Sequence, residues 1–418
     1  MRRQQTMRNV FADFTALARR LGAINLGQGF PSFGAPSFVT SAAVEAIANV
    51  GEPSTVDHNQ YTRPGGHPSL VEAVAEFYAP HFNRAIDPMT EVCSCNGAQT
   101  GLFLAISALS KPGDEVLTIE PYFDAYTKIA RLIGATPKGV PLRQGADGEY
   151  ALDLAELESA ITDRTRLLLL NTPHNPTGKV FTLHELEGIA SIVRRHPNII
   201  VVSDEVYEWG VFGGGDAVHH RIATLPGMAD RTVSLYSAGK TFSVTGWRVG
   251  YAIAPPALTM PMIATQATVA FCSAAPLEVA VGNALRRGTA AGHFVDLPAT
   301  LKRKSDALDA SLRTAMLAPR AAPEGGYFVV ADASGIAEEL AETVGSFDEF
   351  EREIAGGEPN YELTIALAKR RGVVGIPMAA FYSPAYRHLA GDAVRFAFAK
   401  TDAELEAAGA ALSASSSK

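Results

Sequence analysis

A lysine at position 240 lies in a setting where a side-chain amine could do covalent chemistry. It follows residues 232–236, an apolar stretch of strand length, and small residues surround it. An amine at the end of a parallel strand lies at the edge where ligands bind in open α/β sheets, and it can form a Schiff base with a carbonyl. Ser237 and Arg248 could bind a phosphate through a hydroxyl and a guanidinium group. Taken alone, a lysine after a strand is more often a surface residue.

A second stretch places an acid at the end of another apolar run. Asp204 follows residues 198–203, and Tyr207 comes three positions later. A buried carboxylate needs a cation nearby, and a protonated pyridine nitrogen is such a cation. An acidic partner keeps the ring protonated, so that the ring can absorb the electrons of a substrate carbanion. Tyr207 could donate a hydrogen bond to a phenolate oxygen on the same ring. The competing interpretation of Asp204 is a residue that caps a helix N-terminus.

Two turns add polar groups at other predicted strand ends. Asn175 follows a run of four leucines, and its amide could donate to the same ring oxygen, although turn asparagines are common without such a role. Ala98 and Gln99 begin an apolar, helix-like stretch directly after Gly97. The free N–H groups and the dipole of a helix start can bind an anion there. A single glycine at a helix start is a weak indication by itself.

Apolar segments of strand length alternate with helical stretches through the middle of the chain. Strands separated by helices predict an α/β fold with a mostly parallel sheet and helices on both faces. The leucine run predicts a strand that is buried on both faces. The predicted strands are 92–94, 115–119, 166–171, 198–203, 232–236 and 249–253, and residues 98–109 are a predicted helix.

The sequence pattern changes after about residue 290. Residues 297–315 have the pattern of a long, charged surface helix, and residues 327–331 and 394–398 are predicted strands of a smaller sheet. We therefore predict a large domain over residues 45–290. A smaller domain would combine residues 1–44 with residues 291–418.

Composition narrows the function classes. The 418 residues are 47% apolar and carry a net charge of −8, so nucleic acid and anionic membranes are poor partners. No apolar run is long enough to span a bilayer. Three cysteines cannot build a disulfide framework, and we expect Cys93 and Cys95 to be small buried side chains rather than half of a metal site. The reducing cytoplasm fits best, with mitochondrial import as the alternative because residues 1–5 are basic.

Motifs along nearly the whole chain resemble the fold-type-I aminotransferases of classes I and II, which use pyridoxal 5′-phosphate (PLP). Within that family, the closer resemblance is to the kynurenine aminotransferases, also called glutamine transaminase K or cysteine-S-conjugate β-lyase. The motifs are NLGQGFP at 25–31, NQYTRP at 59–64, EPYFD at 120–124, SDEVYE at 203–208, SAGKTFSVTGW at 237–247, PEGGYF at 323–328 and VRFAFAK at 394–400.

The resemblance implies a fold and a set of residue roles. The fold is a large domain with a mostly parallel, seven-stranded sheet, a smaller α+β domain, and a homodimer with active sites shared across the interface. Lys240 is the Schiff-base lysine and the base, and Asp204 and Tyr207 are the other catalytic residues. Contacts to PLP are implied for Ala98, Gln99, Phe123, Asn175, Asp204, Tyr207, Ser237, Lys240 and Arg248, with Tyr61 reaching the phosphate of the neighbouring subunit. Substrate contacts are implied for Gly29, Asn175, Phe11 and Arg395, with Arg395 gripping the α-carboxylate.

The implied reaction moves an amino group from an L-amino acid to a 2-oxo acid. Phe11, Tyr122, Phe123 and Phe271 predict a roomy pocket for large uncharged or aromatic side chains, such as those of kynurenine, glutamine and methionine. β-Lyase chemistry on cysteine S-conjugates is a predicted side reaction. Two alternatives stay open: a dedicated C–S β-lyase, which needs no 2-oxo acid, and another class I/II enzyme such as a succinyl-diaminopimelate aminotransferase.

Overall fold

The larger sheet has eight strands in the order β2-β9-β8-β7-β6-β3-β4-β5. The computed structural model describes residues 9–49, 57–145, 148–214 and 217–414. Strands β3, β4, β6, β7 and β8 run parallel, while β9 is antiparallel to both of its neighbours and β5 is antiparallel to β4. The strands are β2 (Val92–Cys95), β3 (Glu115–Glu120), β4 (Thr136–Gln144), β5 (Tyr150–Leu152), β6 (Thr165–Asn171), β7 (Ile200–Asp204), β8 (Thr232–Ser237) and β9 (Gly250–Ile253).

The leucine run in β6 shows why this sheet is buried on both faces. Leu167 and Leu169 belong to one apolar core, and Leu168 and Leu170 belong to another. Successive side chains of a strand point to opposite faces, so both faces need a cover of helices. Core packing on one face comes from α4 (Ala98–Leu109), α5 (Ala125–Leu132) and α9 (Pro256–Val269), and on the other from α6 (Leu154–Ser159) and α7 (Leu183–Arg195).

The edge of the sheet that carries β2 and β9 has a core of its own. It is packed by α3 (Pro68–Phe82) and α10 (Ala275–Gly288), and α2 (Ser37–Ala48) lies against α10. Cys93 and Cys95 are buried in β2, as predicted.

A second lobe surrounds a smaller antiparallel sheet of order β10-β11-β14-β13. The N-terminal segment joins this lobe, because β1 (Ile24–Asn25) pairs with β12 (Val373–Val374). The sheet consists of β10 (Ala318–Pro319), β11 (Phe328–Asp332), β13 (Ile376–Pro377) and β14 (Ala393–Ala397). The lobe's helices are α1 (Val10–Leu21), α12 (Ala337–Val344), α13 (Glu349–Ala355), α14 (Pro359–Arg371) and α15 (Asp402–Ser413).

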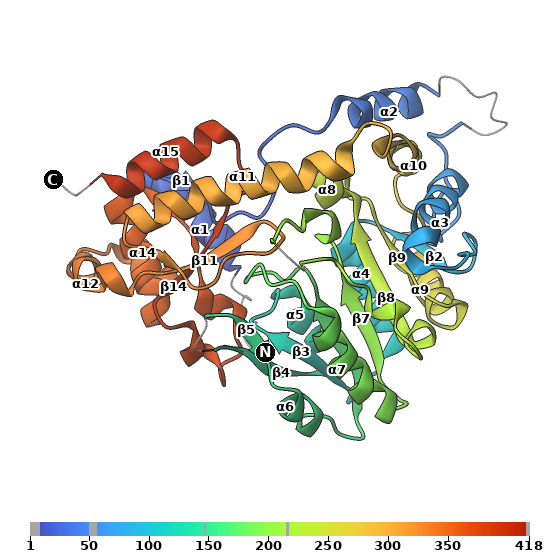
Figure 1. Cartoon of the computed structure of the whole chain (residues 1–418), viewed down its shortest axis with the longest axis horizontal. Helices are drawn as coiled ribbons and strands as arrows, with labels where there is room; N and C mark the ends of the chain where they lie inside the picture. The colour runs from blue at the N-terminus through green and yellow to red at the C-terminus, as the bar shows by residue number, and fades with distance from the viewer. Residues whose placement is uncertain (1–8, 50–56, 146–147, 215–216, 415–418) are drawn as a thin grey trace, which may run out of the picture.

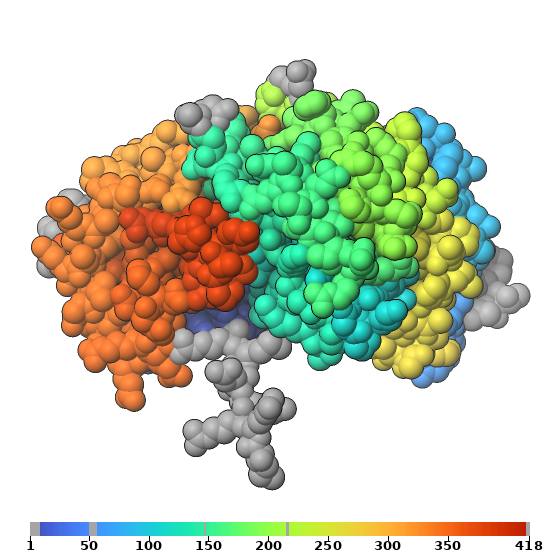
Figure 2. Space-filling view, turned by 90° about the horizontal axis from the view of Figure 1, so that it is seen from below, coloured from blue at the N-terminus to red at the C-terminus, as the bar shows by residue number. Residues whose placement is uncertain are grey.

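The two lobes lie side by side (Figures 1 and 2), and one long helix extends along both (Figure 1). This helix, α11 (His293–Thr314), covers most of the surface helix predicted over 297–315. The α/β fold class and the separate smaller sheet are confirmed, with β5 as an additional edge strand. The domain boundaries at residues 44/45 and 290/291 stay a prediction.

No helix among the described residues combines the length and the apolar character needed to cross a bilayer. The basic residues 1–5, on which the alternative of mitochondrial import depends, lie outside the described part of the chain.

Candidate active site

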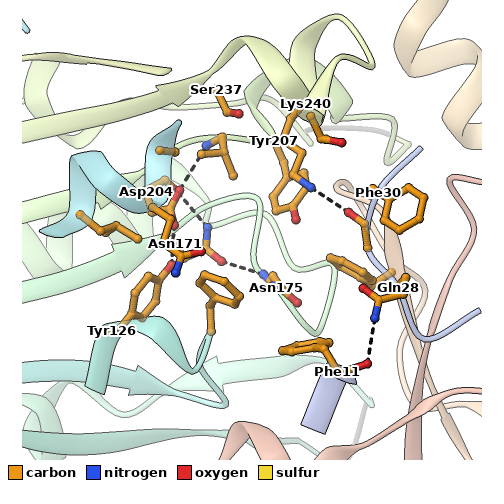
Figure 3. Close-up of a pocket in the computed structure, with 18 of the residues that line it drawn as sticks. Phe11, Gln28, Phe30, Tyr126, Asn171, Asn175, Asp204, Tyr207, Ser237 and Lys240 are labelled. Atoms are coloured by element: carbon orange, nitrogen blue, oxygen red, sulfur yellow. Dashed lines mark hydrogen bonds between the residues drawn. The ribbon is translucent and has the colours of Figure 1, made fainter. Parts of the chain in front are cut away.

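A cavity of about 480 Å³ opens at the carboxyl ends of β6, β7 and β8, between the two lobes (Figure 3). Residues from β14, from the N-terminal segment and from the start of α4 also face it. Eleven of the predicted site residues line this cavity together with Gly29. They are Phe11, Ala98, Gln99, Phe123, Asn175, Asp204, Tyr207, Ser237, Lys240, Arg248 and Arg395.

Lys240 lies on a short helix, α8 (Ala238–Thr241), that begins where β8 ends. Its Nζ donates a hydrogen bond to the backbone oxygen of Gly29, at 2.7 Å. Burial lowers the pKa of this amine to about 7, and the positive charge of Arg395 acts in the same direction. An amine with such a pKa is present partly as the free base near neutrality, so it can act as a nucleophile or accept a proton.

Asp204 is the last residue of β7 and points into the same cavity. Its Oδ2 accepts a hydrogen bond of 2.6 Å from the hydroxyl of Tyr126, on α5. Burial raises the pKa of the carboxyl to about 6, against the hydrogen bond from Tyr126, which lowers it. A buried acid of this kind is stabilised by a cation, and a ring nitrogen that carries a proton fits the requirement.

Asn171 fixes the backbone beside Asp204. This last residue of β6 donates from Nδ2 to the backbone oxygen of Asp204, at 2.8 Å, and its Oδ1 accepts from the backbone N–H of Asn175, at 2.7 Å. The three residues are thereby held as one unit (Figure 3). Because β6 and β7 pair in register, Asn171 lies directly opposite Asp204.

Tyr207 and Phe123 supply aromatic walls. Tyr207 is buried, and its ring centroid lies 5.6 Å from Nζ of Lys240. Burial raises the pKa of the Tyr207 hydroxyl, which keeps it protonated as a hydrogen-bond donor. Phe123 lies edge-on to Tyr126, with ring centroids 5.9 Å apart.

Arg395 comes from the smaller sheet and is almost fully buried, at 1% exposure. Its guanidinium donates to Oδ1 of Asn175, at 2.9 Å, and to the backbone oxygen of Gly27, at 2.7 Å, and it lies 3.9 Å from the ring centroid of Phe328. Nε has no partner among the described residues. Burial lowers the pKa of Arg395 to about 9, and among the described residues the structure gives it no ion pair with an acid. A carboxylate is the complementary ligand.

The opposite end of the cavity has the features of a phosphate site. The helix α4 starts at Gly97 without a side-chain cap, which leaves the first N–H groups, at Ala98 and Gln99, free to bind an anion. Gly97 has φ +83°, and a Cβ there would lie 2.3 Å from Nη2 of Arg248. A glycine at this position favours the backbone conformation and leaves room for the guanidinium, which donates to the backbone oxygens of Thr245 and Asn96. Ser237 completes this end.

Three residues named from the sequence lie away from this cavity. Tyr122 is buried elsewhere, so its expected place in the substrate pocket is wrong. Tyr61 and Phe271 lie edge-on to one another, 5.2 Å apart, and are 83% and 49% exposed. Neither lines the cavity of its own chain, and the role of Tyr61 at a neighbouring subunit stays a prediction.

The structure also brings in residues that the sequence did not single out. Tyr126, Asn171, Gln28 and Phe328 all face the cavity. Asn171 could have been found as the polar end of the leucine strand, by the same reasoning that identified Asp204. Tyr126 carries no such signal, because its place depends on how α5 packs against the sheet.

Comparison with known proteins gives a consistent result. The family model for aminotransferases of class I and II matches residues 22–412. The chain is 40% identical to a kynurenine–oxoglutarate transaminase from Dictyostelium discoideum, and the alignment covers 96% of this chain and 92% of the relative. It is 38% identical to kynurenine–oxoglutarate transaminase 3 of Mus musculus, over 96% of this chain and 86% of that protein.

A solved structure shares the fold at similar identity. The N-succinyldiaminopimelate aminotransferase of Mycobacterium tuberculosis superimposes with a TM-score of 0.85 and is 37% identical, covering 97% of each chain.

Proposed function

Because this chain belongs to the aminotransferase class I and II family, we propose that it moves the amino group of a large, uncharged or aromatic L-amino acid to a 2-oxo acid. The observation that carries the proposal is a half-buried amine and a buried carboxylate, Lys240 and Asp204, at adjacent strand ends of one cavity. The family's cofactor is PLP, which supplies an aldehyde and an electron-withdrawing ring.

The residues at the two ends of the cavity support this cofactor. The start of α4, with Ser237 and Arg248, offers donors to a phosphate, and Asp204 offers a negative charge to a protonated ring nitrogen. Tyr207 and Asn175 are proposed to donate to the ring oxygen, and Phe123 to stack on the ring. Lys240 is proposed to hold the cofactor and then to move the proton between the substrate and cofactor carbons.

The substrate end fits an amino acid. Arg395 is proposed to bind the α-carboxylate, with help from the backbone at Gly29. Gly29 has no room for a side chain, because a Cβ would lie 2.4 Å from Cζ of Phe328. Phe11 and Phe328 exclude water from the same end.

Charge supports a substrate with a neutral side chain. Among the described residues that line the cavity, the cations are Lys240, Arg248 and Arg395, and each has a proposed role at the cofactor or the α-carboxylate. No further cation is available there for a side-chain carboxylate. Kynurenine, glutamine and methionine therefore fit better than aspartate or a succinylated diamino acid.

Two alternative functions differ from the proposed one in their amino donor or in their need for a 2-oxo acid. A dedicated C–S β-lyase would release pyruvate and ammonia without a 2-oxo acid, and a succinyl-diaminopimelate aminotransferase would ignore kynurenine, glutamine and methionine. A panel of donors and acceptors on purified protein separates the three. β-Lyase activity on cysteine S-conjugates is proposed only as a side reaction.

The test of the proposed function is Lys240→Ala. Transamination should fall by more than about 1,000-fold, since both the covalent link and the proton transfer are lost, while the fold is kept. Borohydride treatment of the wild type followed by mass spectrometry should find PLP on Lys240. Lys128→Ala, a half-buried lysine of α5 that does not line the cavity, is the control. Near-normal turnover of Lys240→Ala would contradict the assignment.

We also propose that the active unit is a cytoplasmic homodimer. An exposed aromatic pair, Tyr61 and Phe271, is unusual on a free surface and suits a place at a neighbouring subunit. Tyr61 is proposed to reach the phosphate in the partner's site. Molar mass in solution and cell fractionation test the assembly and the compartment.

A further inference from the structure

The turn that carries Asp204 and Tyr207 has two different sides. Asp204 and Tyr207 line the cavity, whereas Glu205 and Glu208 do not. Both glutamates are buried, at 0% and 5% exposure. The turn is closed by a hydrogen bond of 3.0 Å from the N–H of Glu208 to the oxygen of Glu205. Whatever fixes the two glutamates therefore also fixes the two residues that face the cavity.

Glu205 is held by strand β8 and by one histidine. Ser234 and Tyr236 donate their hydroxyls to its carboxylate, each at 3.1 Å. Nε2 of His219 lies 2.9 Å from the same carboxylate. The hydroxyls anchor one end of the turn to the sheet, but they bring no formal positive charge.

Arg221 links the two acids. Its Nη2 donates to Oε2 of Glu208, and its Nε lies 3.7 Å from Oε2 of Glu205. Tyr78, on α3, donates its hydroxyl to the other oxygen of Glu208, and the guanidinium lies 5.7 Å from the ring centroid of Tyr78. Arg221 itself is 9% exposed, so this ionic bridge is shielded from solvent.

The same cluster has the ligand types of a metal site but not the charge balance of one. Ligand atoms of Glu205, Glu208 and His219 lie within 4.8 Å of one another. The guanidinium of Arg221 already contacts both carboxylates and supplies the positive charge that a metal would bring. A second cation would be repelled there.

We propose that Arg221 is a positioning residue for the cofactor: by bridging Glu205 and Glu208 it fixes the turn that presents Asp204 and Tyr207 to the ring. This inference rests on the proposed function. Removing one partner of a buried ionic group leaves the other charges uncompensated, so the turn would rearrange or one acid would take up a proton.

Titration behaviour is consistent with such a bridge. Burial acts to raise the pKa of Glu205, but the hydrogen bond and charge of His219 and the charge of Arg221 bring it below its usual range. Burial raises the pKa of Glu208 to about 7 even with Arg221 beside it. Glu205 thus carries the firm negative charge of the pair.

The test compares Arg221→Lys, Arg221→Met and the double variant Glu208→Gln/Arg221→Met with the wild type. PLP is titrated into each apoenzyme by absorbance, and kcat and KM are measured separately. In Arg221→Met the Kd for PLP should rise and kcat should fall, each by about tenfold or more, while KM for the amino donor changes by less than about twofold. Arg221→Lys should lie between Arg221→Met and the wild type.

The double variant separates positioning from folding. It removes one of the acids that would lack a partner, so its melting temperature should approach that of the wild type, yet its weak PLP binding should persist. Arg166→Met serves as the control. This arginine lies at the amino end of β6, and among the described residues its side chain donates to the backbone oxygens of Leu109 and Asn198.

Wild-type PLP affinity and kcat in the folded double variant would overturn the role of Arg221. Failure of the wild-type protein itself to bind PLP would overturn the proposed function, and this inference with it.

Discussion

At Asp204, the hydrogen bond from Tyr126 contributes most among the hydrogen bonds that keep the carboxylate charged, ahead of the one from the backbone N–H of Val206. Burial raises the pKa of this acid to about 6, and the bond from the Tyr126 hydroxyl opposes that shift. The bond is 2.6 Å long and lies on the side of α5. The charge that a ring nitrogen meets in this cavity therefore depends on Tyr126, a residue that the sequence did not single out.

Tyr126→Phe should weaken PLP binding at low pH. Without the donor, the pKa of Asp204 rises further, so the carboxylate is protonated at a higher pH and its attraction for the ring nitrogen is lost earlier. The acid limb of PLP binding to the apoenzyme should move up by about one pH unit.

Absorbance titrations at a series of pH values measure this shift. Tyr122→Phe is the matched control, since Tyr122 is a buried tyrosine of the same segment outside the cavity. An unchanged acid limb in Tyr126→Phe would show that the bond does not adjust Asp204.

Which of the site residues can be predicted from the sequence depends on the element that carries each of them. Lys240, Asp204 and Asn175 follow apolar strands, and the ends of parallel strands meet at one edge, so their convergence could be expected. Tyr126 and Phe328 face the same cavity from different lobes. Tyr126 lies on α5, which packs against the larger sheet, and Phe328 lies on β11 of the smaller sheet. Only the packing of those elements brings them there, and no local pattern announces it.

Among the elements, the start of α4 is the one whose backbone is shaped for a ligand. Gly97 adopts φ +83° and ψ 157°, a conformation that essentially only glycine adopts. Its missing side chain lets the guanidinium of Arg248 lie against the helix start. The conformation demands glycine, and a side chain there would in addition displace the guanidinium of Arg248.

Gly97→Ala should reduce both stability and PLP affinity. Backbone strain of this kind costs about 1–3 kcal/mol, and the added methyl group displaces Arg248 from the proposed phosphate site. Thermal unfolding and PLP titration measure the two effects. Gly246→Ala is the control, because a Cβ there meets no atom within 4 Å. Equal effects from both substitutions would contradict the proposed role of Gly97 at the phosphate site.

Two strands of the large sheet, β4 and β5, were not predicted from the sequence pattern, and the composition of β4 explains why it was missed. The strand β4 contains Pro137, Gly139 and Pro141, which are poor strand residues in isolation. Gly139 is required by packing, since a Cβ there would lie 1.6 Å from Oε1 of the buried Glu120. Tertiary contacts therefore set this strand, whereas the apolar runs of β6 and β7 are visible from sequence alone.

At the scale of the whole molecule, the proposed dimer predicts that two inactive variants restore activity when they form mixed dimers. Subunits with Lys240→Ala keep an intact Tyr61, and subunits with Tyr61→Ala keep an intact lysine. If Tyr61 serves the partner's site, a mixed dimer has one complete site. Random mixing in equal amounts should then restore about a quarter of wild-type activity, since half of the dimers are mixed.

Activity is assayed after the two variants are unfolded and refolded together, with each variant refolded alone as the control. An activity no higher than the average of the separate variants would place Tyr61 outside the neighbouring site.

The relation between the lobes is the part least accessible from sequence. Arg395 bonds to Asn175, which is 220 residues away, and to Gly27 near the other end of the chain. A buried arginine on a strand indicated that a partner must exist. Which partner it finds depends on how the smaller sheet sits against the larger one.

The helix α11 gives this arrangement a mechanical consequence. At its first residue, Nε2 of His293 lies 2.7 Å from the backbone oxygen of Thr241, the neighbour of Lys240, and its 22 residues extend about 33 Å towards the smaller lobe. A rigid helix of this length can transmit a rotation of the smaller lobe about its first residue, which lies beside the lysine. A rotation of the smaller lobe about that end would move Arg395 relative to Asn175 while the reactive amine stays in place, so substrate could be gripped or released without disturbing the group that holds the cofactor.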